Sequence, residues 1–434
     1  MPPPRMLLIL VIALTSGVLV AACGKDESPQ TPTNAVTVVT FPVVGPKGEK
    51  QHAEAELGFP VLATKNTTRV AGADPIADAA AAARAVFPSV TPELRPKAVA
   101  LVDVHDWRAA LAASVLMSSP IHAPVLMSDG TKMPKTTQSA LDALAPTGSE
   151  PAGGAQVVRV GNVARPPGLK TTDLVGKDPA TLARAIDAFQ ASAKGTSSDA
   201  VMLVSADKPE YAMPAAAWAA KSGDPILYTY KDTLPEATRA AIVAHRSPKI
   251  YVIGPSSVIS PQVTRALRPL GEIIRVGDQD PQANAIAFAR FSDSSFGWGV
   301  IDPGHGLVFA NPTRPADAAA ASPLSASGTW GPLLLVNEDG SLPQSLTDYL
   351  LDIQPGYRDD PTRGVYNHAW IIGDDKAISV AAQSQIDQYL EIAPVNTKAP
   401  PTATTTTPTT TTTTATTPTT TTSTTSTTKT STTP

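Results

Sequence analysis

Residues 173–189 read DLVGKDPATLARAIDAF, and the same pattern occurs twice more along the chain. In each copy an apolar, strand-like run ends at a glycine, and a helix with apolar side chains at helical spacing begins at an Asp-Pro pair. The other two copies read RVAGADPIADAAAAARAV from Arg69 and RVGDQDPQANAIAFARF from Arg275. The glycines of the three copies are 104 and 101 positions apart. A regular period of this length indicates tandem repeats of one structural unit.

Two further sequence markers follow the same period. The first is a proline followed by an apolar strand, in APVLMSD around Pro124, DPILYTY around Pro225 and GPLLLVN around Pro332. The second is an apolar strand that ends in glycine, at Gly161, Gly254 and Gly373. Because these independent markers share one period, we expect three copies of the same fold.

The second copy is typical of an α/β unit. After the helix that starts at Asp178 come apolar strands at 201–204, 226–230 and 250–253, each followed by a helical pattern. Short apolar strands that alternate with helices form parallel sheets covered on both faces, because each crossover contains a helix. The expected fold class is therefore α/β, in three tandem units.

The Asp-Pro pairs have a structural interpretation. An Asp at the N-cap accepts hydrogen bonds from the free amides of the first helical turn, and Pro at the next position is already set for helix. Asp74, Asp178 and Asp280 are therefore expected to cap helices. The alternative is a phosphate bound at the same helix N-termini, which the capping carboxylates would repel.

Composition and charge exclude several classes of function. The chain has 434 residues with 42% hydrophobic side chains, which is enough for packed cores in about three domains. Its 34 basic and 38 acidic side chains give a net charge of −4, so no broad cationic surface is available for nucleic acid. A single Cys excludes a disulfide framework and a Cys-ligated zinc site.

The N-terminal segment is typical of an exported protein. Arg5 precedes an apolar run at 6–20, which has the length of a signal-peptide core. The sequence LVAAC at 19–23 resembles a bacterial lipobox. That resemblance implies a cleaved lipoprotein signal peptide at 1–22, acyl chains such as palmitate on Cys23, and a position on the outer face of the cell membrane, facing the wall. The alternative is an ordinary secretory signal with an incidental Cys.

Polar segments flank the repeats. Residues 23–34 are predicted to be a linker after the lipidated Cys, and residues 35–66 an N-terminal extension of the first repeat. Residues 394–434 are predicted to be a disordered Thr- and Pro-rich tail, because residues 401–434 contain 24 Thr and a single charge. Such tracts are extended and often O-glycosylated. We expect the tail to reach outward through the wall, with neutral drift at a tolerant terminus as the alternative.

These features together resemble the cell-wall-binding repeat type 2 family. Its Ile-Leu-Leu strand corresponds to an apolar triplet in every unit, at Val125-Leu126-Met127, Ile226-Leu227-Tyr228 and Leu333-Leu334-Leu335. The resemblance implies three toprim-like open parallel-sheet repeats with pseudo-threefold symmetry, at 67–165, 166–271 and 272–393. It also implies that surface grooves bind an anionic wall polymer or a peptidoglycan-associated glycan non-covalently.

The sequence departs from the family where the family usually has an Arg after the Asp. Prolines stand there instead, at Pro75, Pro179 and Pro281. The remaining cations near the motifs are candidates for polymer contacts, because guanidinium groups suit phosphate and carboxylate. They are Arg69, Arg84, Arg275 and Arg290. The alternative is that these arginines are solvated at element ends. Phe296 and Trp298 could stack on sugar rings, although a buried corner is the commoner role.

No motif indicates catalysis, a metal or a cofactor. GxSxG, HExxH and P-loop patterns are absent, and the six His residues show no metal-ligand spacing. His105 is expected to be a loop or cap residue. The predicted function is a non-catalytic, lipid-anchored protein that binds a cell-wall polymer through three repeats. The alternative is the solute-binding lipoprotein of a transport system, but such proteins have two lobes and a threefold period argues against them.

Overall fold

The computed structural model describes residues 62–70 and 72–395, all within one compact unit. The predictions for the signal segment, Cys23, the linker and most of the Thr-rich tail concern residues outside these ranges. Within them, no helix combines the length and the apolar character needed to cross a bilayer.

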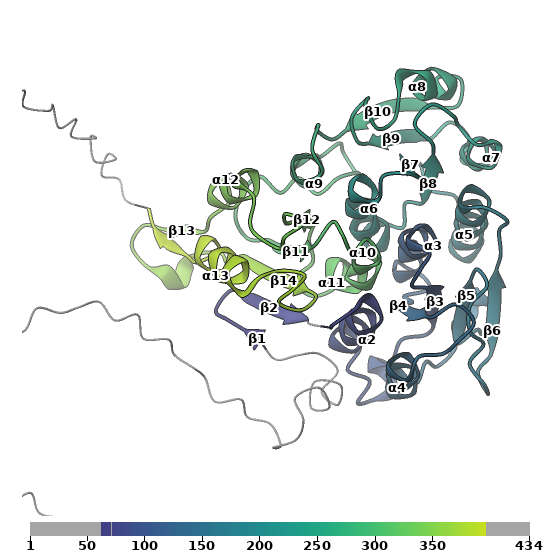
Figure 1. The fold of residues 1–434 in the computed structure, drawn as a ribbon, viewed down its shortest axis with the longest axis horizontal. Helices are drawn as coiled ribbons and strands as arrows, with labels where there is room; N and C mark the ends of the chain where they lie inside the picture. The colour runs from purple at the N-terminus through teal and green to yellow at the C-terminus, as the bar shows by residue number, and fades with distance from the viewer. Residues whose placement is uncertain (1–61, 71, 396–434) are drawn as a thin grey trace, which may run out of the picture. The chain divides into compact units, whose positions relative to one another are not determined.

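Parallel sheets with a common strand order form the frame of the unit (Figure 1). The first sheet has the order β4 (Val125–Ser128), β3 (Val99–Asp103), β5 (Val157–Val160) and β6 (Thr171–Leu174). The second has the order β8 (Ile226–Thr229), β7 (Ala200–Ser205), β9 (Lys249–Ile253) and β10 (Glu272–Val276). The third has the order β12 (Leu333–Leu335), β11 (Gly306–Ala310), β14 (His368–Ile372), β2 (Thr67–Val70) and an antiparallel edge strand, β1 (Leu62–Ala63). A separate two-stranded ribbon consists of β13 (Gly356–Tyr357) and β15 (Ala393–Pro394). The predicted α/β class with parallel sheets is confirmed, whereas the threefold symmetry stays a prediction.

The first long strand of the described chain belongs to the third sheet. β2 pairs in parallel with β14, with Arg69 opposite Ile371. β6 and β10 hold the corresponding edge position in the first and second sheets. The strand of each repeated motif therefore lies at or next to the edge of one sheet, and the helix after it packs on the next sheet. Each turn between a motif glycine and its Asp-Pro pair leads the chain from sheet to sheet. The repeat boundaries expected at residues 67, 166 and 272 stay predictions.

The helices of the three motifs begin where the Asp-Pro pairs predict. They are α2 (Pro75–Val86), α5 (Pro179–Lys194) and α9 (Pro281–Arg290). In each, the capping carboxylate accepts a hydrogen bond from the backbone amide three residues on, at 2.9, 2.8 and 2.8 Å for Asp74, Asp178 and Asp280. The capping role is confirmed, and a carboxylate already stands where a phosphate would bind.

The glycine before each Asp-Pro pair lets a strand end lie directly against a helix start. A Cβ on Gly176 would overlap the backbone of Leu182 in α5. A Cβ on Gly72 would lie 2.6 Å from Ala77 and from Asp78 of α2, closer than real Cβ atoms come to other atoms. These turns therefore require glycine for space.

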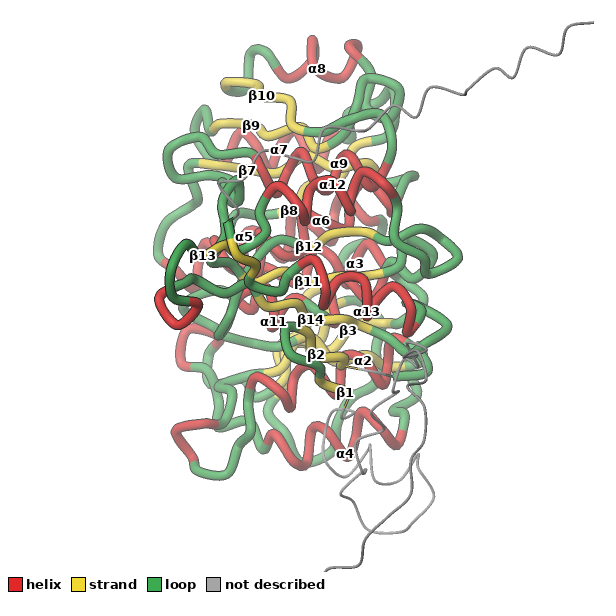
Figure 2. The backbone as a smooth tube through the Cα atoms, turned by 90° about the vertical axis from the view of Figure 1, so that its left-hand side faces the viewer, coloured by secondary structure: helices red, strands yellow, loops and turns green. Residues whose placement is uncertain are grey.

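Small side chains line the contacts between the central helices. These are α3 (Trp107–Ala113), α6 (Pro209–Ser222), α10 (Ala316–Ala320) and α11 (Ser322–Ala326), which lie between the three sheets (Figure 1). Buried Ala residues recur along α3, α6 and α10, so these helices pack closely. The other helices are α4 (Lys135–Leu144), α7 (Glu236–Ala244), α8 (Pro261–Leu267), α12 (Gln344–Asp352) and α13 (Val380–Tyr389). Short 3-10 helices occur at Pro92–Leu94, Ser114–Met117, Glu150–Ala152 and Pro361–Arg363. Figure 2 shows helices and strands interleaved through the unit.

Candidate functional site

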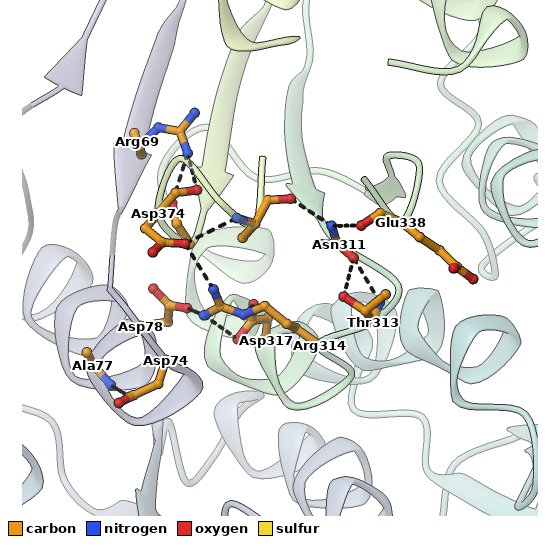
Figure 3. A network of polar contacts seen from close by, with 12 residues as sticks. Arg69, Asp74, Ala77, Asp78, Asn311, Thr313, Arg314, Asp317, Glu338 and Asp374 are labelled. Atoms are coloured by element: carbon orange, nitrogen blue, oxygen red, sulfur yellow. Dashed lines mark hydrogen bonds and ion pairs between the residues drawn. The ribbon is translucent and has the colours of Figure 1, made fainter. Parts of the chain in front are cut away.

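Polar side chains at the carboxyl ends of the central strands β3, β7 and β11 form hydrogen bonds within the loops that follow these strands. Such ends are where open α/β sheets commonly bind ligands. Here a polar residue accepts a hydrogen bond from the amide two positions on, at 3.1, 3.1 and 2.9 Å for Asp103, Ser205 and Asn311. Asn311 also donates to the carbonyls of Glu338 and Ala377 (Figure 3). Throughout residues 62–70 and 72–395, no group of three or more His, Cys, Asp or Glu side chains is placed to hold a metal.

Two of the predicted polymer-binding arginines donate hydrogen bonds to the loops that follow β9 and β14. Arg275 on β10 donates to the carbonyls of Gly254 and Ile259, at 2.6 and 2.8 Å. Arg69, at the corresponding place on β2, donates to the carbonyl of Gly373 at 3.0 Å and is 3% exposed. Burial lowers the pKa of both guanidinium groups. Arg69 is therefore a structural residue that the surface does not present to a polymer.

The other two predicted arginines lie on helices. Arg290, at the end of α9, forms an ion pair with Asp352, and its guanidinium carbon lies 4.8 Å from the ring centre of Tyr349. Arg84 is half-buried in the last turn of α2. The four predicted arginines thus come from four different elements and have different surroundings.

Arg275 lines an open groove together with an arginine that the sequence analysis did not single out. This arginine groove has a volume of about 440 Å³ and is lined by Thr264, Arg268, Gly271, Ile273 and Arg275. Arg268 is exposed at the end of α8. Among the described residues, no carboxylate lies within ion-pair distance of Arg268 or Arg275. Guanidinium groups that no internal carboxylate neutralises can bind phosphate or carboxylate groups.

A buried ion network joins α2 to the third sheet (Figure 3). Arg314, just before α10, forms ion pairs with Asp78 of α2 and with Asp317, the latter at 2.7 Å, and lies 3.4 Å from Asp374 after β14. Asp78 and Asp317 are completely buried. Burial raises the pKa of Asp317 to about 6 and raises the pKa of Asp78 as well. With two buried acids around one arginine, this network holds the junction together and is no site for a polyanion.

Residues 174–264, from the end of β6 into α8, match the family model of cell wall binding domain 2 (CWB2). The resemblance that the repeats predicted is confirmed. The CWB2 match contains the second copy of each repeated marker, at Gly176, Pro225 and Gly254. It includes the Ile226-Leu227-Tyr228 strand, which forms the start of β8. It ends at Thr264 in the arginine groove, so Arg268 and Arg275 lie just beyond it.

Two solved structures are similar to this chain in fold. Cwp6 from Clostridium difficile has a TM-score of 0.58 and 17% sequence identity, with 75% of this chain and 48% of that chain covered. Cwp8 from Clostridium difficile has a TM-score of 0.57 and 17% identity, with 75% and 52% covered. The present chain thus spans about half the length of each, and a likeness at this identity shows the fold alone. No curated protein matches the chain.

Proposed function

We propose that this protein binds an anionic polymer of the cell wall non-covalently and catalyses no reaction on it. The match of residues 174–264 to CWB2 is the observation that carries the proposal. The fold shared with Cwp6 and Cwp8 over 75% of the chain supports it. The three sheets with a common strand order give no support to a two-lobed solute-binding protein.

The arginine groove is the proposed contact with the polymer. The chain has a net charge of −4, so an anionic partner is bound best by cations that are locally free of carboxylates. Arg268 and Arg275 satisfy this condition among the described residues. Arg84 and Arg290 remain proposed secondary contacts, whereas Arg69 acts by holding the loop after β14.

Sedimentation with isolated cell walls tests the proposed function. The full chain should pellet with the walls and should be released by salt, because salt screens contacts between exposed charges. Stripping the secondary wall polymers beforehand should abolish retention. A chain that stays in solution at every salt concentration, or that binds stripped and intact walls equally, would contradict the proposal.

Arg268→Ala is expected to weaken wall retention about tenfold at low salt, since a charge-assisted hydrogen bond contributes about 1.5–3 kcal/mol. Arg268 suits this test better than Arg275, whose removal would also free the loop carbonyls that it binds. The matched control is Arg265→Ala, which removes an exposed arginine of the same helix that does not line the groove. Equal retention of the two variants would remove the groove from the binding site.

We further propose that acyl chains on Cys23 anchor the protein to the outer face of the cell membrane. The lipobox-like LVAAC at 19–23 supports this, since a lipobox requires its Cys at that position. Cys23→Ser is expected to move the protein from the membrane fraction to the soluble fraction of cells. Fractionation followed by immunoblotting measures the shift, and retention of the Ser variant in membranes would contradict lipid anchoring.

A further inference from the structure

Three of the chain's five Trp residues line one pocket. Trp218 comes from α6, Trp298 from the loop after α9, and Trp330 from the loop between α11 and β12. The pocket has a volume of about 340 Å³, at the lower end of the range for small-molecule sites. Aromatic residues make up 5% of the sequence, so this gathering is a distinctive feature of the molecule.

The inner wall of this tryptophan pocket is fixed in place. The Nε1 atom of Trp218 donates to Asp224 at 2.8 Å. Trp298 packs edge-on against Trp218, with ring centres 5.2 Å apart and an interplanar angle of 80°. On its other side Trp298 stacks with Trp330, at 6.1 Å and 28°. The two inner indoles are 8% exposed each, so the wall exists before any ligand arrives.

Trp330 is held at the rim with its ring in solvent. It is 41% exposed, although an apolar ring of this size is normally covered. Its loop crosses the start of β11 so closely that a Cβ on Gly331 would overlap the Gly306 carbonyl, and a Cβ on Gly306 would overlap the Thr329 carbonyl. The exposed indole is therefore anchored by its backbone, which lowers the entropy lost when a ligand binds.

Lys221 supplies a cation to the same pocket. Its Nζ lies 3.9 Å from the ring centre of Trp330. No carboxylate of the described residues is within ion-pair distance of it. Burial lowers the pKa of the ammonium group, and no neighbouring acid opposes that shift. The pocket thus offers aromatic faces next to an uncompensated positive charge.

We propose that the tryptophan pocket is a binding subsite for an acidic pyranose, a sugar ring that bears a carboxylate or phosphate group. The apolar face of the sugar would pack on the exposed ring of Trp330, which stacks on Trp298, because aromatic rings bury carbon–hydrogen surface well. Lys221 would bind the anionic substituent through a charge-assisted hydrogen bond. The proposal rests on the proposed function in that the sugar is taken to be part of a wall polymer.

This subsite belongs to the present chain rather than to the CWB2 match. Trp298 and Trp330 both lie outside residues 174–264. In the other two units the position two residues before the marker proline holds His122 or Gly223 instead of Trp330. The pocket is therefore formed once in the described chain, between the second and third sheets, and differs from the arginine groove in its elements and its chemistry.

Saturation-transfer NMR with simple sugars tests the subsite on the full chain. Methyl glucuronoside, an acidic pyranoside, should give a saturable signal, and neutral methyl glucoside should bind about tenfold more weakly. Trp330→Ala should abolish the signal from both, whereas Trp330→Phe should keep most of it. Lys221→Met should make the two probes bind equally. Trp107→Phe, a change outside the pocket and its loops, is the control and should leave binding unchanged.

The outcomes separate the subsite from the proposed function. If neither probe binds, or if Trp330→Ala binds as wild type does, the subsite is overturned even when the wild-type chain still sediments with walls. If the probes bind as expected but the chain does not sediment with walls, the proposed function fails and the subsite stands. Thermal unfolding of Trp330→Ala near the wild-type temperature excludes misfolding as the cause of a lost signal.

Discussion

Arg314→Met is expected to lower the free energy of unfolding by about 3–5 kcal/mol at pH 7, since it leaves buried carboxylates without their counter-charge. Asp78 and Asp317 are completely buried on either side of this guanidinium. Met keeps most of the volume of the side chain while removing its charge. Urea unfolding followed by circular dichroism measures the loss. Arg363→Met, at an exposed site, is the control and should cost less than about 0.5 kcal/mol.

The pH dependence of this loss gives a second readout. Burial raises the pKa of Asp317 from its ordinary 3.8 to about 6, so the folded state holds this proton more tightly than the unfolded chain does. Its contribution to stability is therefore complete below about pH 4 and is lost as the pH rises through about 6. Asp78, Asp74, Asp374 and Arg314 face this network.

Without Arg314 both buried acids should ionise at still higher pH, because the arginine is the group that favours their charged forms. The difference between wild type and Arg314→Met should consequently be largest above about pH 6 and should shrink as the pH falls toward 4, where the acids are neutral in both proteins. A difference that stays constant from pH 4 to 8, or that is below about 1 kcal/mol at pH 7, would show that the network does not hold the junction.

Gly176→Ala is expected to destabilise the fold by about 3 kcal/mol, because its new Cβ would overlap the backbone of Leu182. That backbone belongs to α5 and cannot move without separating the helix from β6. Gly168→Ala is the matched control: Gly168 has φ +74°, but a Cβ there would meet nothing within 4 Å. The control should cost about 1 kcal/mol or less. Similar urea midpoints for the two variants would contradict the role assigned to the Gly-x-Asp-Pro turn.

Local structure was predictable from the sequence because its causes are local. The Asp-Pro pairs set the helix starts through N-caps, which four consecutive residues suffice to form. The apolar triplet at Ile226 marks β8, since a strand buried on both faces reads as a continuous apolar run. Which strand pairs with which could not be predicted from local sequence. The pattern of β2 shows that it is a strand, but pairing with β14 depends on the path of the chain through all three sheets.

The candidate sites likewise contain some residues that a local motif marks and others that only the tertiary structure brings together. Arg275 could be proposed because it stands beside a repeated motif, whereas Arg268 is brought to it by the end of α8 and has no motif of its own. Trp298 drew attention in the segment SSFGWG. Trp330 is a lone aromatic residue in an irregular loop, and its significance comes from contacts with Trp298 and Lys221 that only the tertiary structure provides.

The pairing of β2 with β14 also bears on protein synthesis. A ribosome completes all strands of the first two sheets once residue 276 has been made. β2 then still lacks its parallel neighbour until His368–Ile372 has been added. A nascent or truncated copy therefore exposes an open strand edge of the kind that promotes aggregation.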